Sequence, residues 1–237
     1  MITSKQWDSD FFGYPVGVLA SNSATDPASL RRQLLQSAFT LVYAFVSPDD
    51  EQSNTHMLEA GGRLADTKLV YAKTNLAQAC TSGLALQDVC GRVDYQYKLL
   101  LQLALQSGQH SRFRTDPHFV KQEYHRLYTA WLDRSLDRTI ADHVWAYSVG
   151  TEIAGFITDK RKEDYVEIGL LAVNPAFRGT GIGSALIRRV ESLAAAAGLS
   201  SVEVATQKQN QQACRFYEYN GYQIKEAQNI YHFWQSA

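Results

Sequence analysis

The sequence has few cysteines and no cluster of basic residues, and both absences narrow the classes of function. Its 237 residues include three cysteines, Cys80, Cys90 and Cys214, with no CxxC pair. An odd, scattered set without histidines at metal-ligand spacing argues against a disulfide framework and a zinc site, so we expect no metal. Lysine and arginine total 23 against 24 aspartates and glutamates, mixed along the chain. Without a basic patch, we expect no nucleic-acid partner and a small, diffusible ligand instead.

Long apolar runs are missing as well. The first residues, MITSKQWDSDFFG, lack the basic and apolar regions of a secretory signal. No run in the chain approaches the ~18 apolar residues that a membrane span requires. We therefore expect no membrane contact and a location in the reducing cytoplasm.

The length favours one domain with a substantial addition, because it lies between one and two typical domains of ~150 residues. The stretch least typical of a helix or strand, Gln78 to Gly83, is the best candidate domain boundary. It divides the chain into an N-terminal part, residues 1–80, and a main domain, residues 81–237. The pattern of the main domain reads β-α-α-β-β-β-α-β-α-β-β, which is typical of a mixed α/β fold with helices on both faces of one sheet.

A short internal similarity suggests a duplication. The segment MLEAGGRL, which starts at Met57, lines up with FYEYNGYQI, which starts at Phe216, at an offset of 159 residues. Each segment ends a predicted helix that follows an apolar strand. We infer that the N-terminal part is a truncated copy of the main domain.

The most informative stretch is VNPAFRGTGIGSALI, from Val173 to Ile187, with three glycines between a predicted strand and a predicted helix. Ordered glycines cost backbone entropy, so they favour a place where a ligand approaches the backbone closely. The N–H groups at a helix start attract phosphate oxygens. A dinucleotide site would need an acid about 20 residues further on, and a P-loop would need a Lys-Ser/Thr pair; both are missing. The loop therefore predicts a different phosphate-bearing ligand.

This loop, with its R-x-x-G-x-G pattern, resembles the acetyl-CoA motif of the GCN5-related N-acetyltransferases (GNAT), and the order of elements resembles that fold from Leu84 to Trp234. The resemblance implies a GNAT-type central mixed sheet flanked by helices, preceded by a truncated GNAT-like N-terminal half-domain. It also implies acetyl-CoA as cosubstrate, with its pyrophosphate held by the loop and its pantetheine arm beside a splayed strand. The residues implied at the coenzyme are Leu171, Ala172, Val173, Arg178, Gly179, Thr180, Gly181, Ile182, Gly183, Ser184, Asn210 and Tyr217.

A narrower resemblance, within that family, is to the TDP-fucosamine acetyltransferases. It is carried by WDSDFFG at Trp7, SRFRTD at Ser111 and VATQKQNQQACRFY at Val204. It implies a TDP-linked amino-dideoxyhexose as acceptor, in cell-surface polysaccharide synthesis, and a homodimer. Arg112 and Arg114 would suit the diphosphate, because a guanidinium fork matches phosphate geometry; the alternative is two solvated loop cations.

Amide formation from a thioester needs a neutral amine, donors for the oxyanion and a proton for the thiolate. Backbone N–H groups near Leu171 and Val173 would supply the oxyanion donors if the strand splays. Tyr217 is the candidate acid through its position, since a phenol pKa of about 10 exceeds a thiol pKa of about 8.5; the alternative is a packed aromatic ring. Asn210 is a helix cap, a coenzyme contact or both. Glu167 is a candidate base acting through water, or a solvent-facing strand residue.

The sequence thus predicts an acetyl-CoA-dependent N-acetyltransferase of a nucleotide-linked amino sugar. Two alternatives stay open at this point. One is a relative acting on another small amine or a protein N-terminus. The other is a non-catalytic module that senses acyl-CoA and would not need a proton donor at Tyr217.

Overall fold

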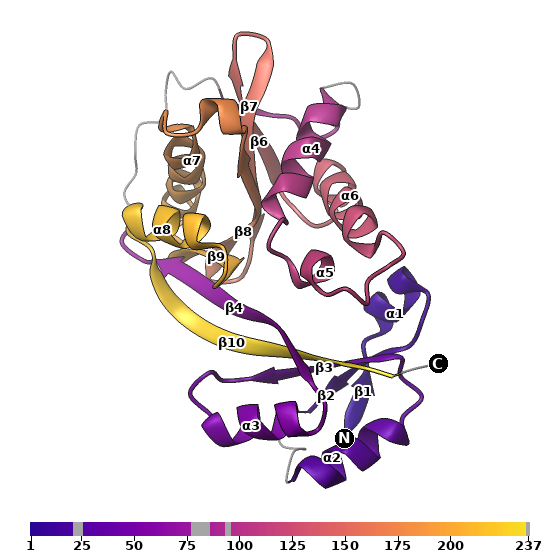
Figure 1. Cartoon of the computed structure of the whole chain (residues 1–237). Helices are drawn as coiled ribbons and strands as arrows, with labels where there is room; N and C mark the ends of the chain where they lie inside the picture. Colours follow the sequence, from indigo (N-terminus) through magenta and orange to yellow (C-terminus); the bar gives the residue numbers. More distant parts are fainter. Residues whose placement is uncertain (21–25, 77–85, 93–95, 236–237) are drawn as a thin grey trace.

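The computed structural model describes residues 1–20, 26–76, 86–92 and 96–235, and these residues form one ten-stranded sheet with helices on both faces (Figure 1). The order of strands across the sheet is β1-β2-β3-β10-β4-β9-β8-β7-β6-β5. Both parallel and antiparallel pairs occur, which confirms the predicted mixed α/β fold. The strands are β1 Ile2–Ser4, β2 Val16–Leu19, β3 Leu41–Val46, β4 Arg63–Lys73, β5 Leu86–Asp88, β6 His143–Val149, β7 Glu152–Arg161, β8 Tyr165–Val173, β9 Ser201–Gln207 and β10 Gln223–Trp234. The helices are α1 Gln6–Phe12, α2 Pro27–Leu35, α3 Glu51–Glu59, α4 Tyr97–Ser107, α5 Arg112–Thr115, α6 Glu123–Leu136, α7 Ile182–Ala196 and α8 Gln211–Tyr219.

Local capping signals fix where several helices begin. The Asp26 carboxylate accepts from the N–H of Ser29 at 2.8 Å, and Pro27 occupies the first helical position of α2. In α3 the cap is Asp50, whose carboxylate accepts from the N–H of Ser53 at 2.9 Å. Loss of such a cap typically costs about 1 kcal/mol of stability.

The helices divide between the two faces of the sheet. Figure 1 shows α7 and α8 on one face of the upper sheet and α4, α5 and α6 on the other. The largest core cluster packs α7 and α8 against β4, β7, β8 and β9. On the opposite face, α4 and α6 pack against β6, β7 and β8. Around β3, α2 and α3 cover one face, while α1 and α5 cover the other. Buried clusters therefore cover both faces of the shared sheet.

The two parts of the chain exchange strands in the middle of the sheet. The long strand β10, from the C-terminal end, lies between β3 and β4 of the N-terminal part, and β4 lies between β10 and β9 (Figure 1). Two separate strand pairs were expected around residues 64–74 and 222–234. Each proves to be one continuous strand, because neither segment contains glycine or proline, and bulges interrupt the pairing register instead. The expected boundary, residues 78–83, lies outside the described residues, so the division at residue 80 stays a prediction.

The duplication is visible in the structure at an offset of 160 residues, one more than the sequence alignment gave. The unit β3-α3-β4 repeats as β9-α8-β10 with matching bounds. Gly61 and Gly221, which end α3 and α8, share a positive φ of 94° and 83°. In the pairing of β4 with β10, Lys68 lies opposite Gln228, its own counterpart. The two units are thus related by a twofold axis through this pair, and each supplies a strand to the other.

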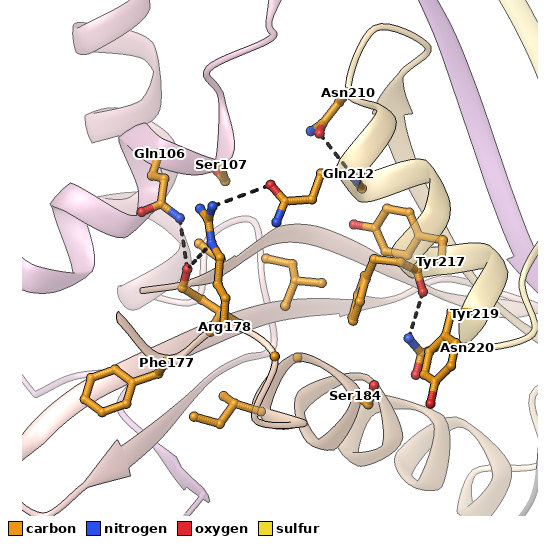
Figure 2. A pocket seen from close by; sticks show the side chains of 18 of the residues that line it. Gln106, Ser107, Phe177, Arg178, Ser184, Asn210, Gln212, Tyr217, Tyr219 and Asn220 are labelled. Atoms are coloured by element: carbon orange, nitrogen blue, oxygen red, sulfur yellow. Dashed lines mark hydrogen bonds between the residues drawn. The ribbon is translucent and has the colours of Figure 1, made fainter. Parts of the chain in front are cut away.

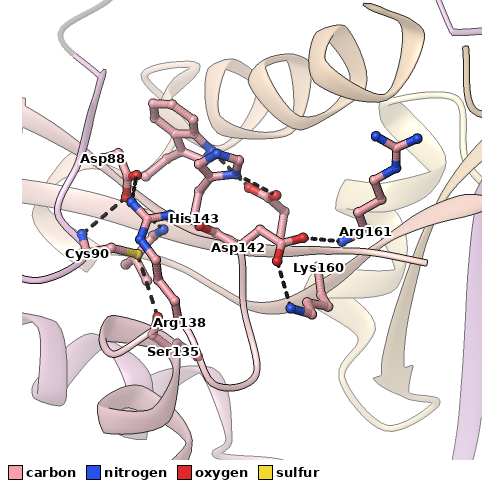
Figure 3. A network of polar contacts seen from close by, with 11 residues as sticks. Asp88, Cys90, Ser135, Arg138, Asp142, His143, Lys160 and Arg161 are labelled. Atoms are coloured by element: carbon pink, nitrogen blue, oxygen red, sulfur yellow. Dashed lines mark hydrogen bonds and ion pairs between the residues drawn. The ribbon is translucent and has the colours of Figure 1, made fainter. Parts of the chain in front are cut away.

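Polar side chains fasten the far edge of the sheet at β5 (Figure 3). The Asp88 carboxylate accepts from the Arg138 guanidinium at 2.7 Å and from two backbone N–H groups. Although burial opposes it, these donors lower the pKa of Asp88. Nearby, Asp142 accepts from Lys160 Nζ and from the Arg161 N–H, both at 2.7 Å. The short edge strand is therefore held by charge-assisted hydrogen bonds as well as by its pairing with β6.

Candidate active site

The candidate site is a cleft where two parallel strands diverge. Pairing between β8 and β9 ends at Ile168 and Val204, although β8 continues to Val173 and β9 to Gln207. This is the splayed strand that the sequence resemblance implied. The cleft has a volume of about 780 Å³. Its lining comes from α4, the end of β8, the glycine loop, α7 and α8, and comprises Gln106, Ser107, Gln109, His110, Leu171, Ala172, Val173, Phe177, Arg178, Gly179, Gly181, Ile182, Gly183, Ser184, Arg188, Asn210, Gln212, Ala213, Phe216, Tyr217, Tyr219 and Asn220.

The glycine loop delivers the N-terminus of α7 to this cleft. Gly179 and Gly181 have φ of 76° and 84°, a conformation that side chains with a Cβ rarely adopt, and the space around both is open. The first bond of α7 joins the Ala185 N–H to the Gly181 carbonyl, so the preceding N–H groups lack helical partners. An open cradle of free N–H groups at a helix start fits a pyrophosphate.

Gly183 serves packing rather than the ligand. A Cβ there would lie 2.9 Å from the ring of Phe216, so a side chain would force α7 and α8 apart. Glycine is therefore required at these three positions for two different structural reasons. Gly179 and Gly181 permit the turn, and Gly183 permits close contact between the two helices that line the cleft.

Polar side chains converge on one carbonyl at the end of β8 (Figure 2). The Val173 carbonyl accepts from Gln106 Nε2 at 3.0 Å and from Arg178 Nε at 3.3 Å. Arg178 also donates to Gln212 Oε1 at 3.5 Å, so its side chain connects β8 with α8. Gln106 and Arg178 thus occupy the Val173 carbonyl, a backbone group that the sequence resemblance assigned to the pantetheine arm. A coenzyme bound along β8 would have to displace the Gln106 and Arg178 side chains from it.

Helix α8 forms the opposite wall. The Asn210 side chain accepts from the N–H of Ala213 at 3.2 Å, which confirms the cap, and it also lines the cleft. Tyr217 lies two turns along the same face, is 5% exposed and reaches the cleft. Burial, with a smaller effect of Cys214, raises the pKa of its phenol. A phenol that stays protonated and lies at the cleft can donate a proton but is a poor base.

The structure brings together all but two of the residues predicted for catalysis or for the coenzyme. Thr180 belongs to the loop but does not line the cleft, because its hydroxyl donates to the Phe177 carbonyl at 2.6 Å. Glu167 lies one residue before the strands diverge and forms an ion pair with Lys162 at 2.8 Å, with both side chains substantially exposed. It does not line the cleft either. Its role as a base stays a prediction.

The residues predicted to bind the diphosphate, Arg112 and Arg114, lie outside the cleft. They belong to a polar cluster between α5 and the exchanged strands β4 and β10. The Arg112 guanidinium lies 4.9 Å from the centre of the Tyr43 ring and 4.4 Å from that of Phe113. Burial raises the pKa values of Asp8 and Asp66, and the nearby Arg112 charge opposes part of that rise. Much of its charge is thus balanced within the fold.

Arg114 is exposed and lies 5.5 Å from the centre of the Tyr124 ring. Neither Arg112 nor Arg114 is among the residues that line the cleft, so their substrate role stays a prediction.

The same cluster contains a buried histidine and carboxylate. His232 Nδ1 lies 2.6 Å from Asp116 Oδ2, and both side chains are fully buried. Burial lowers the pKa of His232 to about 4, although Asp116 opposes the change. Despite burial, hydrogen bonds from His232, Trp234 and His118 hold the pKa of Asp116 well below its usual range. A neutral imidazole thus donates to an ionised carboxylate, and together they join α5 to β10.

Sequence reasoning missed the α4 side of the cleft and part of α7. Gln106, Ser107 and His110 belong to the end of α4 and the turn after it, which no motif marked. Arg188, one turn beyond Ser184 on α7, follows the loop at helical spacing. That spacing was a usable signal for Arg188, because one helix face extends from the loop along the cleft.

Two absences concern only the parts of the chain that the structure describes. In these residues no group of three or more histidine, cysteine, aspartate or glutamate side chains is arranged to hold a metal ion. No helix within the same ranges combines the length and apolar character needed to cross a bilayer.

Comparison with known proteins agrees with this geometry. Residues 106–222 match the model of the acetyltransferase (GNAT) family. The chain is 27% identical over 135 residues to the spore coat polysaccharide biosynthesis protein SpsD of Bacillus subtilis, covering 57% of this chain and 46% of SpsD. It is 32% identical over 112 residues to the uncharacterized N-acetyltransferase MJ1207 of Methanocaldococcus jannaschii, covering 46% of this chain and 50% of that protein. The chain thus spans about half the length of these curated relatives.

Solved structures show the same fold. A GCN5-related N-acetyltransferase from Sphaerobacter thermophilus superposes with a TM-score of 0.58 at 17% identity, covering 87% of this chain and 64% of that one. The solved structure shows the fold alone, whereas the family match relates residues 106–222 to the GNAT acetyltransferases.

Proposed function

We propose that the protein transfers an acetyl group from acetyl-CoA to the amino group of a nucleotide-linked amino-dideoxyhexose. The observation that carries the transfer reaction is the cleft itself, where a glycine-lined helix N-terminus and a buried tyrosine face one space between splayed strands. Fewer observations support the sugar as the acceptor. It is supported by the sequence resemblance and by the similarity to SpsD, which is named for polysaccharide biosynthesis. The cytoplasmic location and the homodimer stay predictions.

Acetyl-CoA supplies the acetyl group as a thioester, and the residues present fit it. The free N–H groups at the start of α7 and the Arg178 guanidinium would hold its phosphates. Backbone groups of β8 beyond Ile168 lack a β9 partner and would hold the pantetheine arm and the developing oxyanion. Asn210 would orient the coenzyme from the start of α8.

The acid step falls to Tyr217. When the amine nitrogen bonds to the carbonyl carbon and the carbon–sulfur bond breaks, the thiolate takes the proton of Tyr217 Oη. The raised pKa of the phenol keeps that proton in place near neutral pH. The amine releases its surplus proton to solvent, and the tyrosinate left at position 217 regains a proton from solvent, so the reaction is balanced without a side-chain base.

Tyr217→Phe tests the acid step, because it removes one oxygen and keeps the ring. We expect kcat to fall about 10²- to 10⁴-fold, the usual loss for a general acid, while the Kd for acetyl-CoA stays near that of the parent. The loss should shrink with an acyl donor whose thiol is more acidic, since that leaving group needs less protonation. Steady-state rates on both donors, after thermal melts confirm folding, make the measurement. A decrease below about threefold would leave Tyr217 as a packing residue.

The acceptor is tested by measuring thiol release from acetyl-CoA with TDP- and UDP-linked amino sugars, free amino sugars and peptide N-termini. We expect turnover with the nucleotide-linked sugars and much less with the free sugars. Equal rates with and without the nucleotide would contradict the nucleotide-sugar assignment and leave the transfer reaction standing. Coenzyme binding with no turnover on any amine would indicate the non-catalytic sensor.

A further inference from the structure

Each exchanged strand carries a tyrosine that lies under a helix of the other part. Tyr71, on β4, is 1% exposed, and its hydroxyl donates to Glu218 Oε1 on α8 at 2.9 Å. Tyr231, on β10, lies 160 residues further on, is 2% exposed, and donates to Asn54 Oδ1 on α3 at 2.7 Å. The duplicated units thus use the same device twice: a buried tyrosine of the incoming strand bonds the helix that covers it.

In only one of the two units does this tyrosine contact a candidate catalytic group. The Tyr71 ring lies 5.6 Å, centre to centre, from the ring of Tyr217, and the Tyr222 ring lies 6.0 Å from it. At the equivalent position of the other unit stands Met57, also buried. A strand of the N-terminal part therefore forms part of the wall behind the proton donor of the main domain.

Packing alone orients the Tyr217 ring. Within the described residues, no hydrogen bond acts on its hydroxyl. The direction of that hydroxyl is therefore set by the rings that enclose it. The hydrogen bond to Glu218 fixes Tyr71 in turn, and Glu218 is the residue after Tyr217 on α8. Ring contact and hydrogen bond together lock β4 to the turn of α8 that carries the acid.

We propose that Tyr71 is a positioning residue for Tyr217, so that the N-terminal part completes the active site. The proposal rests on the proposed function in that Tyr217 is taken as the proton donor. A displacement of about 1 Å at a reacting group can cost on the order of 10²-fold in rate. The β4 strand thus acts on the chemical step without touching either substrate.

Tyr71→Leu tests the proposal, with Tyr231→Leu as the matched control from the equivalent position. We expect Tyr71→Leu to lower kcat at least about tenfold with acetyl-CoA, to change the KM for acetyl-CoA less than about twofold, and to lose less with the more acidic thiol donor. Tyr231→Leu should lower the melting temperature similarly and leave kcat within about twofold. Equal losses of kcat in both variants, or an unchanged kcat in Tyr71→Leu, would overturn the proposal.

Tyr71→Phe keeps the ring and loses the bond to Glu218. It should lower kcat by about threefold, less than Tyr71→Leu does, and Tyr231→Phe should not share that loss. If Tyr71→Leu does not fold, this pair carries the test, and equal kcat values in both Phe variants would refute the positioning role.

A measurement without turnover separates this proposal from the proposed function. With 3-fluorotyrosine incorporated at position 217, the ¹⁹F spectrum should give one sharp line in the parent and in Tyr231→Leu. In Tyr71→Leu we expect a shifted line, broadened or split by alternative ring orientations. An unchanged line would refute the positioning role even if activity fell. Failure to acetylate any amine would instead refute the proposed function.

Discussion

The polar cluster around Arg112 predicts that one buried acid weakens the fold at neutral pH. Asp66, on β4, is 6% exposed, and burial raises its pKa from 3.8 to about 6, although Arg112 and Lys68 lower it. A carboxyl group whose folded pKa is raised binds its proton more tightly in the folded state. Stability therefore falls as the pH rises from about 4 to about 6, and the cost is fully present at pH 7.

Asp66→Asn removes that cost while keeping the shape of the side chain. The shift is roughly two pKa units, and at 1.36 kcal/mol per unit it corresponds to about 3 kcal/mol at pH 7 as an upper value. For a chain of this length 1 kcal/mol raises the melting temperature by about 2–4 °C. We expect Asp66→Asn to melt several degrees higher than the parent at pH 7, with the gap closing near pH 4.

Thermal melts of parent and variant across that range provide the measurement, and Asp116→Asn is the matched control with the opposite sign. Despite burial, four hydrogen-bond donors from three residues hold the pKa of Asp116 well below its usual range. Its ionised form stabilises the fold above the unfolded pKa, and that contribution is lost as the pH falls. Asp116→Asn should therefore be destabilising at pH 7. If Asp66→Asn also destabilised at pH 7, or shifted the melt equally at every pH, the assignment of a raised pKa would be refuted.

Two further variants test the coenzyme cradle. Gly181→Val should raise the Kd for acetyl-CoA at least about tenfold by calorimetry, because a side chain would enter the open space at the start of α7. Thr180→Val, at a loop position outside the cleft, is its control, and equal affinities in both folded variants would contradict the cradle. Arg188→Ala should weaken coenzyme binding and reduce its dependence on salt, since Arg188 adds a positive charge one turn beyond Ser184. Titrations at two ionic strengths that leave the salt dependence unchanged would place Arg188 outside the phosphate contacts.

The part of the cleft formed by the glycine loop and the start of α8 was predictable because its signals are local. The spacing of Arg178, Gly181 and Gly183 reflects a local backbone conformation and the start of a helix. Residues adjacent in the sequence determine both. The cap at Asn210 and the helical spacing to Tyr217 are local as well. The sequence did not distinguish the glycines that permit the turn from Gly183, which permits helix contact. The contact between Gly183 and Phe216 depends on how α7 packs against α8.

The rest of the architecture could not be predicted because it depends on pairings between distant residues. The register of β4 with β10 joins residues about 160 apart, and no short-range pattern encodes it. The same holds for the α4 wall, where Gln106 contacts Val173 across 67 residues. Glu167 illustrates a third limit. The alternating pattern placed it correctly on a strand, but its partner, Lys162, lies across the turn before β8.

The unit around β3 and α3 differs from the unit around β9 and α8 in the features that would suit a coenzyme. The equivalent cleft, beside β3 and α3, has a volume of about 110 Å³. Its helix cap is Asp50 in place of Asn210, and a carboxylate there repels a phosphate that the helix N-terminus would otherwise attract. Met57 stands in place of Tyr217 and has no proton to donate. The unit nevertheless supports the fold, because without β4 the strand β9 would lose one of its two neighbours and α8 would lose the tyrosine beneath it. A unit of this kind can therefore support the sheet through β4 without a ligand site of its own.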